Sequence, residues 1–211
     1  MPEARTSEKR RSSRTPESKR EALLLAAYAQ LAEHGFEGLR TREIAGVVGV
    51  NIATLHYYFP HKQDLVRSVV GHAMARFRST LTGSGSPAEQ LRGHFEGVRQ
   101  LSRKEPELFA VMGELALRAA RDSAIASILR KTDDAWHETL AKLLRQARDE
   151  GAIEESIDPE GMAALIVAAL KGSYLLPGAS AQPERLDQTL RQLERSLGLR
   201  RSAPRPQTRR R

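Results

Sequence analysis

Apolar positions recur every three or four residues from about residue 16 to residue 197, and no alternating run of useful length interrupts them. This spacing places apolar side chains on one face of an α-helix, whereas alternation would indicate a β-strand. The pattern therefore predicts an all-α, bundle-like protein. We expect about nine helices, at residues 16–34, 41–48, 52–58, 62–81, 87–103, 106–119, 122–149, 159–176 and 183–197.

Several of these helices carry start and stop signals in the sequence. Thr15-Pro16-Glu17 offers a capping hydroxyl, a proline at the first helical position and an acid in the first turn. Glu89 follows Ser86 at the spacing of a capping box. Further starts are marked by Pro106, by Asp158-Pro159 and by Pro183. The Gly-Ser stretch at residues 83–86 is the clearest flexible joint.

The net charge of +8 is concentrated at the two ends of the chain. Residues 1–20 carry seven Lys or Arg and three Glu, and residues 199–211 carry six Arg and no acid. The remaining residues, 21–198, hold 21 basic and 23 acidic side chains and are close to neutral. Basic arms suit a polyanion such as nucleic acid. Charged ends rich in Pro and Ser are also typical of disordered solubilising tails.

The sequence lacks the signals of several classes of protein. It contains no cysteine, which excludes disulfides, thiolate metal sites and cysteine nucleophiles. Its six histidines lack zinc-site spacing, and no phosphate-binding loop or nucleophile elbow is present, so we predict no enzyme activity, metal or cofactor. The longest apolar run, residues 162–170, is too short to cross a bilayer, and the N-terminus has no apolar signal core. These features predict a soluble cytoplasmic protein.

Residues 41–60 have the layout of a helix-turn-helix, with two short helices joined by a tight turn at Gly49. Ala45 is small enough to let the helices cross closely, and Ile44, Val48, Val50 and Leu55 have the spacing to fill the core between them. The second helix of such a motif enters the DNA major groove, which is about 12 Å wide and admits one helix. The alternative is a plain helical hairpin with aromatic core residues.

Polar residues stand where a DNA-binding helix pair would need them. Thr41 is expected to cap its helix and, with Arg42, to lie beside a phosphate. Thr54 can offer a hydroxyl or a methyl group to DNA, and Lys62 stands at the start of the next helix, where it can hold a second phosphate. The remaining candidates in or beside the second helix are Asn51, His56, Tyr57 and Tyr58.

This string resembles the DNA-binding domain of the TetR family of bacterial transcriptional regulators. The resemblance rests on Thr-Arg-Glu-Ile-Ala (41–45), Gly-Val (49–50), Thr-Leu-His-Tyr-Tyr-Phe-Pro (54–60), Lys62 and Leu65, preceded by Ala-Glu-His-Gly-Phe (32–36). It covers roughly residues 16–66. It implies a homodimer with an N-terminal three-helix DNA-binding domain and a larger C-terminal domain that binds a small molecule. Most members are repressors that leave their operator when that ligand binds.

The resemblance also assigns roles to residues. It implies that Thr41 and Arg42 contact phosphate, that Tyr58 and Lys62 anchor the backbone, and that the groove is faced by Ile52, Ala53, Thr54, His56 and Tyr57. His56 stands where the family commonly has Tyr, Ala53 where it often has Gly, and Ile52 where it often has a polar residue. Ile52 can make only apolar contacts, for example with a thymine methyl group. These departures affect the expected operator sequence and leave the DNA-binding role in place.

We therefore expect a basic arm at 1–15, a DNA-binding domain at 16–66, an effector and dimerisation domain at 67–198, and a basic tail at 199–211. Residues 21–65 carry three basic and five acidic side chains, so this module has little long-range attraction for DNA. We hypothesise that the N-terminal arm adds phosphate or minor-groove contacts.

The aromatic residues and methionines of the second domain are candidates for an apolar ligand pocket. They are Met74, Phe77, Phe95, Phe109, Met112, Trp136, His137 and Tyr174. Trp136-His137 is the preferred wall because an indole N–H and an imidazole can orient a ligand, and His94 and Arg118 are further candidates. The alternative is that these side chains fill the core. We expect a largely apolar small molecule as the effector.

The last two helices are the predicted dimer surface. Helix 159–176 is rich in Gly and Ala, and helix 183–197 has leucines at 186, 190, 193 and 197. Two such helices from each subunit can form a four-helix interface around a two-fold axis. Ordinary packing within one chain is the alternative, and the family resemblance favours the dimer.

The sequence as a whole predicts a ligand-responsive repressor that binds a palindromic operator as a dimer, with coupling through helix 62–81. Two alternatives are a constitutive DNA-binding regulator without a ligand, and a helical small-molecule carrier or enzyme with a vestigial DNA-binding domain.

Overall fold

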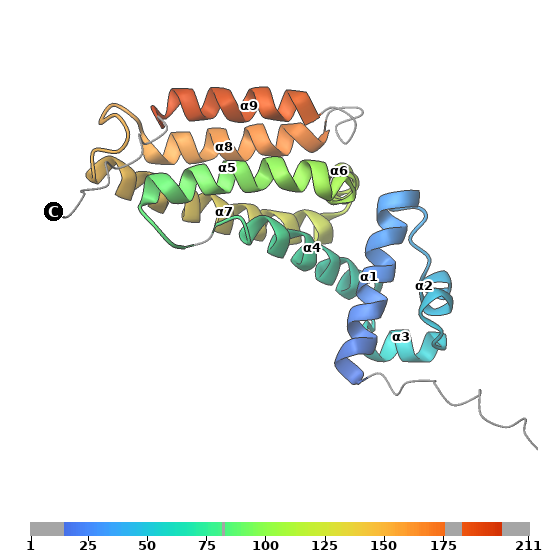
Figure 1. Ribbon diagram of the computed structural model, residues 1–211. Coiled ribbons are helices and arrows are strands. Elements are labelled where there is room, and N and C mark those ends of the chain that lie inside the picture. The colour runs from blue at the N-terminus through green and yellow to red at the C-terminus, as the bar shows by residue number, and fades with distance from the viewer. Residues whose placement is uncertain (1–14, 82, 176–182, 200–211) are drawn as a thin grey trace, which may run out of the picture. The chain divides into compact units, whose positions relative to one another are not determined.

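The computed structural model describes residues 15–81, 83–175 and 183–199. Within them the chain forms nine α-helices and no strand (Figure 1). The helices are α1 Pro16–His34, α2 Thr41–Val48, α3 Ile52–Tyr58, α4 Lys62–Arg78, α5 Pro87–Lys104, α6 Pro106–Ala119, α7 Ser123–Asp149, α8 Pro159–Leu175 and α9 Pro183–Ser196. The predicted all-α fold is confirmed. The predicted basic arms at 1–15 and 199–211 lie outside the described residues, apart from their innermost residues, 15 and 199.

Several helices begin where the sequence places capping side chains. The Thr15 hydroxyl accepts a hydrogen bond from the Ser18 N–H at 3.3 Å. Ser86 and Glu89 form the predicted capping box, in which each side chain accepts from the other residue's backbone N–H. Asp122 caps α7, so that helix begins at Ser123, one residue later than predicted.

Helix α4 ends at Arg78, three residues earlier than predicted. The Ser79 hydroxyl donates to the Arg76 carbonyl at 2.7 Å, and the Thr80 hydroxyl donates to the Phe77 carbonyl at 2.6 Å. Hydroxyl side chains that bond nearby carbonyls offer the backbone an alternative to helical hydrogen bonds. The chain therefore turns at Ser79 and Thr80, although its apolar pattern continues.

The chain divides into two compact units, Met1–Val69 and Val70–Arg211, and α4 runs through the division. In the first unit, α1 packs against α2 and α3 (Figure 1). Its core contains the fully buried Leu23, Ala27 and Leu31 of α1 together with Ile44 of α2 and Leu55 of α3. These positions are spaced as helical apolar faces, which explains why three short helices form a stable unit.

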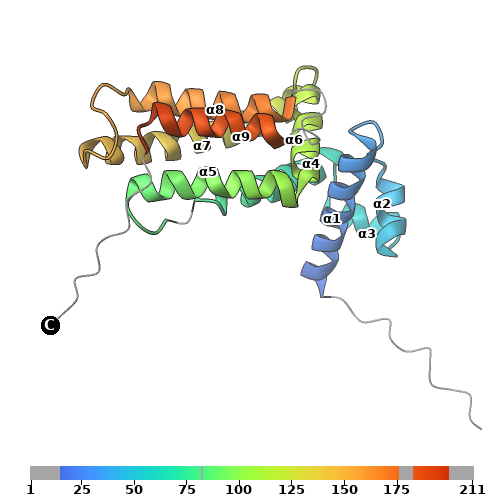
Figure 2. The ribbon, with the colours of Figure 1, turned by 45° about the horizontal axis from the view of Figure 1, so that its top comes forward.

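In the second unit, α5, α7, α8 and α9 run alongside one another and α6 crosses them near one end (Figures 1 and 2). The long helix α7 packs on α8, α5 and α6. None of the described helices is both long and apolar enough to span a membrane.

The leucine stripe of α9 is buried within its own chain. The stripe consists of Leu186, Leu190 and Leu193 of α9 and of Leu197, which directly follows that helix. All four side chains are buried, and α9 packs on α5 and α8. An amphipathic helix lays its apolar face on the nearest apolar surface, which here belongs to the same bundle. The stripe therefore packs on its own chain, as in the alternative given above, and a contribution of α9 to the dimer stays a prediction.

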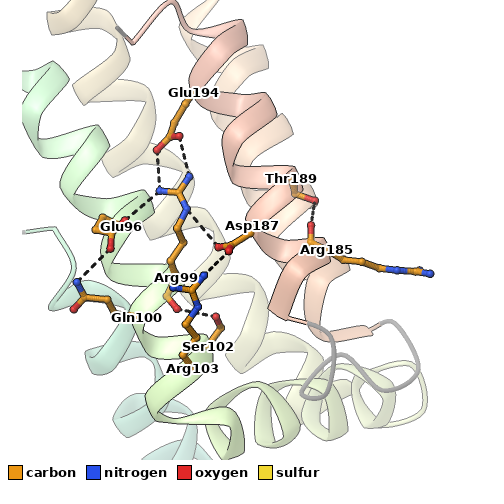
Figure 3. Close-up of polar contacts among 9 residues, drawn as sticks. All are labelled: Glu96, Arg99, Gln100, Ser102, Arg103, Arg185, Asp187, Thr189 and Glu194. Atoms are coloured by element: carbon orange, nitrogen blue, oxygen red, sulfur yellow. Dashed lines mark hydrogen bonds and ion pairs between the residues drawn. The ribbon is translucent and has the colours of Figure 1, made fainter. Parts of the chain in front are cut away.

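The polar side of α9 is tied to α5 by a cluster of ion pairs (Figure 3). Arg99 donates to both carboxylate oxygens of Glu194, at 2.9 and 2.8 Å, and its Nε lies 3.5 Å from Asp187. Arg103 pairs with the other oxygen of Asp187. The hydrogen bond to Glu194 raises the pKa of Arg99. This two-point contact sets the position of α9 along α5.

Candidate functional site

The turn between α2 and α3 depends on Gly49. Its φ of 76° lies in the left-handed region, which a side chain would strain. Its N–H bonds the carbonyls of Ala45 and Gly46, and the Val50 N–H bonds the Ala45 carbonyl at 2.9 Å. These bonds close the helix end, so that α3 begins at Ile52, shortly after α2 ends at Val48.

Asn51 caps α3 and holds Thr54. The Asn51 side-chain oxygen accepts from both the Thr54 backbone N–H, at 2.7 Å, and the Thr54 hydroxyl, at 2.8 Å. Two predicted DNA-contacting residues thus also shape the helix start. Thr54 retains its methyl group and its hydroxyl lone pair for contacts outside the protein.

One face of α3 is exposed to solvent. Ala53, His56 and Tyr57 lie on this face at helical spacing, and 78% of Tyr57 is exposed. Leu55, by contrast, is fully buried. The Tyr57 ring packs edge-on against the ring of the half-buried Tyr58, with centroids 5.1 Å apart. Helix α3 therefore presents a short exposed face on a rigid support.

The N-terminus of α2 differs from the prediction in one respect. Thr41 is the first helical residue and does not cap the helix; the capping position is Arg40. The Arg40 N–H donates to the Gln30 side chain at 3.1 Å, and Gln30 also donates to Glu43. Helix α1 thus positions the start of α2 through the Gln30 side chain. The Arg40 side chain makes no capping hydrogen bond, so the first backbone N–H groups of α2 and the exposed Arg42 can face an anion.

Val47 is an exposed apolar residue of α2 and is not among the residues predicted to contact DNA. It is 76% exposed and shares the outer face of α2 with Glu43 and Gly46. A helical projection of α2 would have revealed an apolar side chain on the polar face. Its exposure in the same unit as Tyr57 makes it a further candidate for an external contact.

Two cation–π contacts support the ends of the motif. The Lys62 ammonium lies 4.5 Å from the centre of the Phe36 ring, and the Arg20 guanidinium lies 5.1 Å from that of Phe59. Phe59 is fully buried just after α3. These contacts hold Lys62 at the start of α4 and fix the end of α3.

The candidate ligand residues of the second unit are buried, apart from His137 and Arg118, which are partly exposed. Three of their rings meet: Phe77 lies 5.7 Å from Phe109 and 5.9 Å from Trp136, centre to centre. The remaining buried candidates are Met74, Phe95, Met112 and Tyr174. Burial, followed by the charge of Asp133, raises the pKa of Tyr174. The aromatic cluster brings together the C-terminal end of α4, α6 and α7.

Trp136 does not share its surroundings with His137. Nε2 of His137 lies 3.2 Å from the Glu160 carbonyl oxygen, in a solvent-exposed position. The ring that meets Trp136 belongs to His94, at a centroid distance of 5.8 Å and nearly at right angles. Neighbouring residues on a helix point about 100° apart, which separates His137 from Trp136. A signal for His94 exists in the sequence, since it interrupts an apolar stripe of α5.

His94 is fully buried and uncharged at neutral pH. Its Nδ1 lies 2.5 Å from the Thr80 hydroxyl oxygen. Burial lowers the pKa of His94 from 6.5 to about 4, because the charged imidazolium would lose its hydration. A neutral imidazole next to an indole is a polar element inside an otherwise apolar cluster.

The three-helix unit, with an exposed short helix after a tight turn, defines a helix-turn-helix DNA-binding protein. A family model for bacterial regulatory proteins of the tetR family matches residues 23–69. A second model, for the C-terminal part of BetI-type transcriptional repressors, matches residues 87–201, more than half of the chain. The chain belongs to the TetR family of bacterial transcriptional regulators and has a DNA-binding domain.

Individual relatives agree with this assignment. CecR, a transcriptional dual regulator from Shigella flexneri, is 37% identical over 106 residues, which cover 50% of this chain and 43% of CecR. The match therefore spans less than half the length of that relative. KstR2, a transcriptional repressor from Mycobacterium tuberculosis, is 24% identical over 145 residues, covering 67% of this chain and 72% of KstR2.

The fold is shared with solved structures. A TetR transcription regulator from Haloarcula marismortui superposes with a TM-score of 0.77 at 21% identity, covering 86% of this chain and 97% of that chain. The named relatives are all transcription regulators, and none is described as an enzyme.

Proposed function

We propose that this regulator represses transcription as a homodimer bound to a palindromic operator, and that a small molecule releases it. Residues 16–66 would bind DNA, and residues 67–198 would bind the effector and the second subunit. Repression is favoured by the BetI-type repressor model and by the repressor KstR2 among the relatives. Because the target would be chromosomal DNA, we place the protein in the cytoplasm.

The exposed face of α3 is the observation on which this proposal depends. In the major groove, Tyr57 and His56 would lie against bases or phosphates, and Ala53 would allow close approach. Thr54 would contribute its methyl group and hydroxyl oxygen, and Ile52 an apolar contact. The remaining contacts would go to the DNA backbone, through Thr41, Arg42, Tyr58 and Lys62, with Asn51 holding the start of α3.

The dimer would form on α8. Its outer face is apolar and exposed in the single chain: Leu165 is 51% exposed and Leu175 is 45% exposed. Gly161, Ala164 and Ala168 share this outer face and are small enough for close helix approach. A self-complementary stripe of this kind suits a two-fold interface. A second copy would place a second α3 on the same duplex.

The effector would act on α4. Phe77, in the aromatic cluster, and Arg76, paired with Glu105 at the α5–α6 junction, both belong to the last turns of α4. The same helix begins at Lys62, next to the proposed DNA-contacting residues. A ligand that favours another position of this helix end would shift the population away from the DNA-binding form.

Selection of bound sequences from a random duplex pool tests the proposal. We expect one enriched sequence, which Arg42→Ala binds about tenfold more weakly with a reduced salt dependence. The matched control is Arg191→Ala, which removes an exposed arginine of α9 and should bind like the parent protein. No enriched sequence, or equal losses for both variants, would contradict the proposal.

A further inference from the structure

Two buried polar atoms in the aromatic cluster have no hydrogen-bond partner within residues 15–81, 83–175 and 183–199. They are Nε2 of His94 and Nε1 of Trp136. Buried polar groups in folded proteins are nearly always paired, since an unpaired one loses its hydration without compensation. The two rings that carry these atoms have centres 5.8 Å apart, which makes the atoms candidates to bind one external partner together.

The hydrogen bonds of Thr80 determine which of these atoms donates. The Thr80 hydroxyl oxygen lies 2.6 Å from the Phe77 carbonyl oxygen, and such a short approach requires the hydroxyl proton between the two oxygens. Thr80 can then only accept from His94 Nδ1, at 2.5 Å. His94 is therefore protonated on Nδ1, and its Nε2 is an acceptor. The indole Nε1–H of Trp136 is a donor only.

Gly97 of α5 allows the close approach of Thr80 to His94. A Cβ atom on Gly97 would lie 2.6 Å from both Cβ and Cγ2 of Thr80, far inside contact distance. Glycine at this position of α5 therefore lets the turn after α4 come close enough for Thr80 to reach His94. The surrounding rings of Phe77 and Phe95 are apolar. Because burial keeps His94 uncharged, it offers no positive charge to a carboxylate.

We propose that His94 and Trp136 together recognise the hydroxyl group of an uncharged, largely apolar effector. The hydroxyl donates to Nε2 of His94 and accepts from Nε1–H of Trp136. A ketone or an ether can satisfy only the indole, and a hydrocarbon can satisfy neither ring. The inference rests on the proposed function, in which the second unit binds the effector, and adds the chemical class of that effector.

Calorimetric titration of the full chain with matched probes tests the inference. The probes are 4-butylphenol, its methyl ether 4-butylanisole, and butylbenzene. We expect the phenol to bind roughly fivefold more tightly than the ether, which lacks the hydrogen bond to His94, and roughly thirtyfold more tightly than butylbenzene, which lacks both hydrogen bonds. Equal affinity for the three probes, as expected where water satisfies both rings, or no binding by any, overturns the inference.

Two variants separate recognition from packing. His94→Phe keeps an aromatic ring but removes the acceptor, and should abolish the preference for the phenol. Thr80→Val removes the partner of Nδ1, which frees the proton to move to Nε2, so the ether should gain affinity relative to the phenol. The second variant retains His94 and gives a readout even where His94→Phe fails to fold. An unchanged phenol-to-ether ratio in Thr80→Val counts against the inference.

Binding of the selected duplex without probe is measured in parallel. A protein that binds this duplex but treats the probes alike would refute the hydroxyl site and leave the proposed function intact. A protein that prefers the phenol but binds no duplex would support the site and refute the proposed function.

Discussion

Asn51 and Thr54 are joined by two hydrogen bonds that end on the same oxygen atom, one from the Thr54 backbone N–H and one from its hydroxyl. The first bond caps α3, and the second sets the rotamer of a side chain proposed to meet DNA. This residue pair thus contributes both to the stability of α3 and to the proposed DNA contact. Substitutions at Asn51 can distinguish the two contributions.

Asn51→Ala should lower the free energy of unfolding by about 1 kcal/mol and weaken DNA binding, because the cap of α3 is lost. Asn51→Asp keeps an oxygen acceptor and should restore stability, since a carboxylate is favourable at a helix N-terminus. It should still bind DNA poorly, because it places a negative charge beside phosphates. Urea unfolding and duplex titration measure the two effects. Full DNA affinity in Asn51→Asp would place Asn51 away from the duplex.

Tyr57→Ala should reduce operator affinity at least tenfold while leaving stability within about 0.5 kcal/mol, because this side chain is largely exposed. Leu117→Ala is the matched control, since Leu117 is 64% exposed in the second unit. Fluorescence anisotropy with the selected duplex checks both variants. A Tyr57→Ala protein with parental affinity would show that α3 does not face the groove.

Leu165→Glu should convert the proposed dimer into a folded monomer, because it places a charge on the outer face of α8. Leu193→Ala should act differently, costing about 2–5 kcal/mol of stability with no change in subunit association, because Leu193 lies in the core of its own chain. Analytical ultracentrifugation and thermal unfolding distinguish the two. A dimeric Leu165→Glu protein would exclude this face of α8 as the interface.

Arg99→Met should destabilise the second unit by about 1–3 kcal/mol, because it leaves Glu194 and Asp187 half-buried without their shared partner (Figure 3). The exposed Arg191 provides the control, and Arg191→Met should change stability little. Both are compared by urea unfolding. Equal effects would mean that the cluster adds nothing beyond ordinary surface charge.

The pH dependence of stability should contain a contribution from His94. Its pKa is about 4 in the folded protein and 6.5 in the unfolded chain, so between these values the unfolded chain binds more protons. The free energy of unfolding should therefore fall as the pH decreases from about 6.5 to about 4. The loss from this group should be about 3 kcal/mol.

His94→Phe should lack this component. The measurement is the difference between the parent and variant unfolding curves across the pH range, which removes the contributions of the other titrating groups. Parallel pH profiles would mean that His94 titrates alike in the folded and unfolded chains.

Much of the fold could be predicted because local signals mark the helix boundaries. Thr15, Ser86 and Asp158 each lie at a helix start, and their short polar side chains bond backbone N–H groups within three residues. The early end of α4 could not be predicted, because it depends on which backbone carbonyls accept hydrogen bonds from the Ser79 and Thr80 hydroxyls. The start of α2 depends on Gln30, whose approach is a tertiary contact.

The candidate sites likewise contain some features that follow from local sequence patterns and others that depend on tertiary contacts. The exposed face of α3 follows from helical spacing, since Leu55 must be buried and Tyr57 lies two residues beyond it. The pairing of Trp136 with His94 joins positions 42 residues apart, which no local pattern encodes. For the same reason, the sequence could not tell whether the α9 leucines face their own bundle or a second subunit.

The most direct measurement of the central claim is the stoichiometry and symmetry of the complex with the selected duplex. Sedimentation of the complex should give an even number of chains per duplex, and scrambling one half-site should reduce affinity by at least tenfold. A single chain bound to one site, with affinity unaffected by the second half-site, would contradict the account of two α3 helices reading one operator.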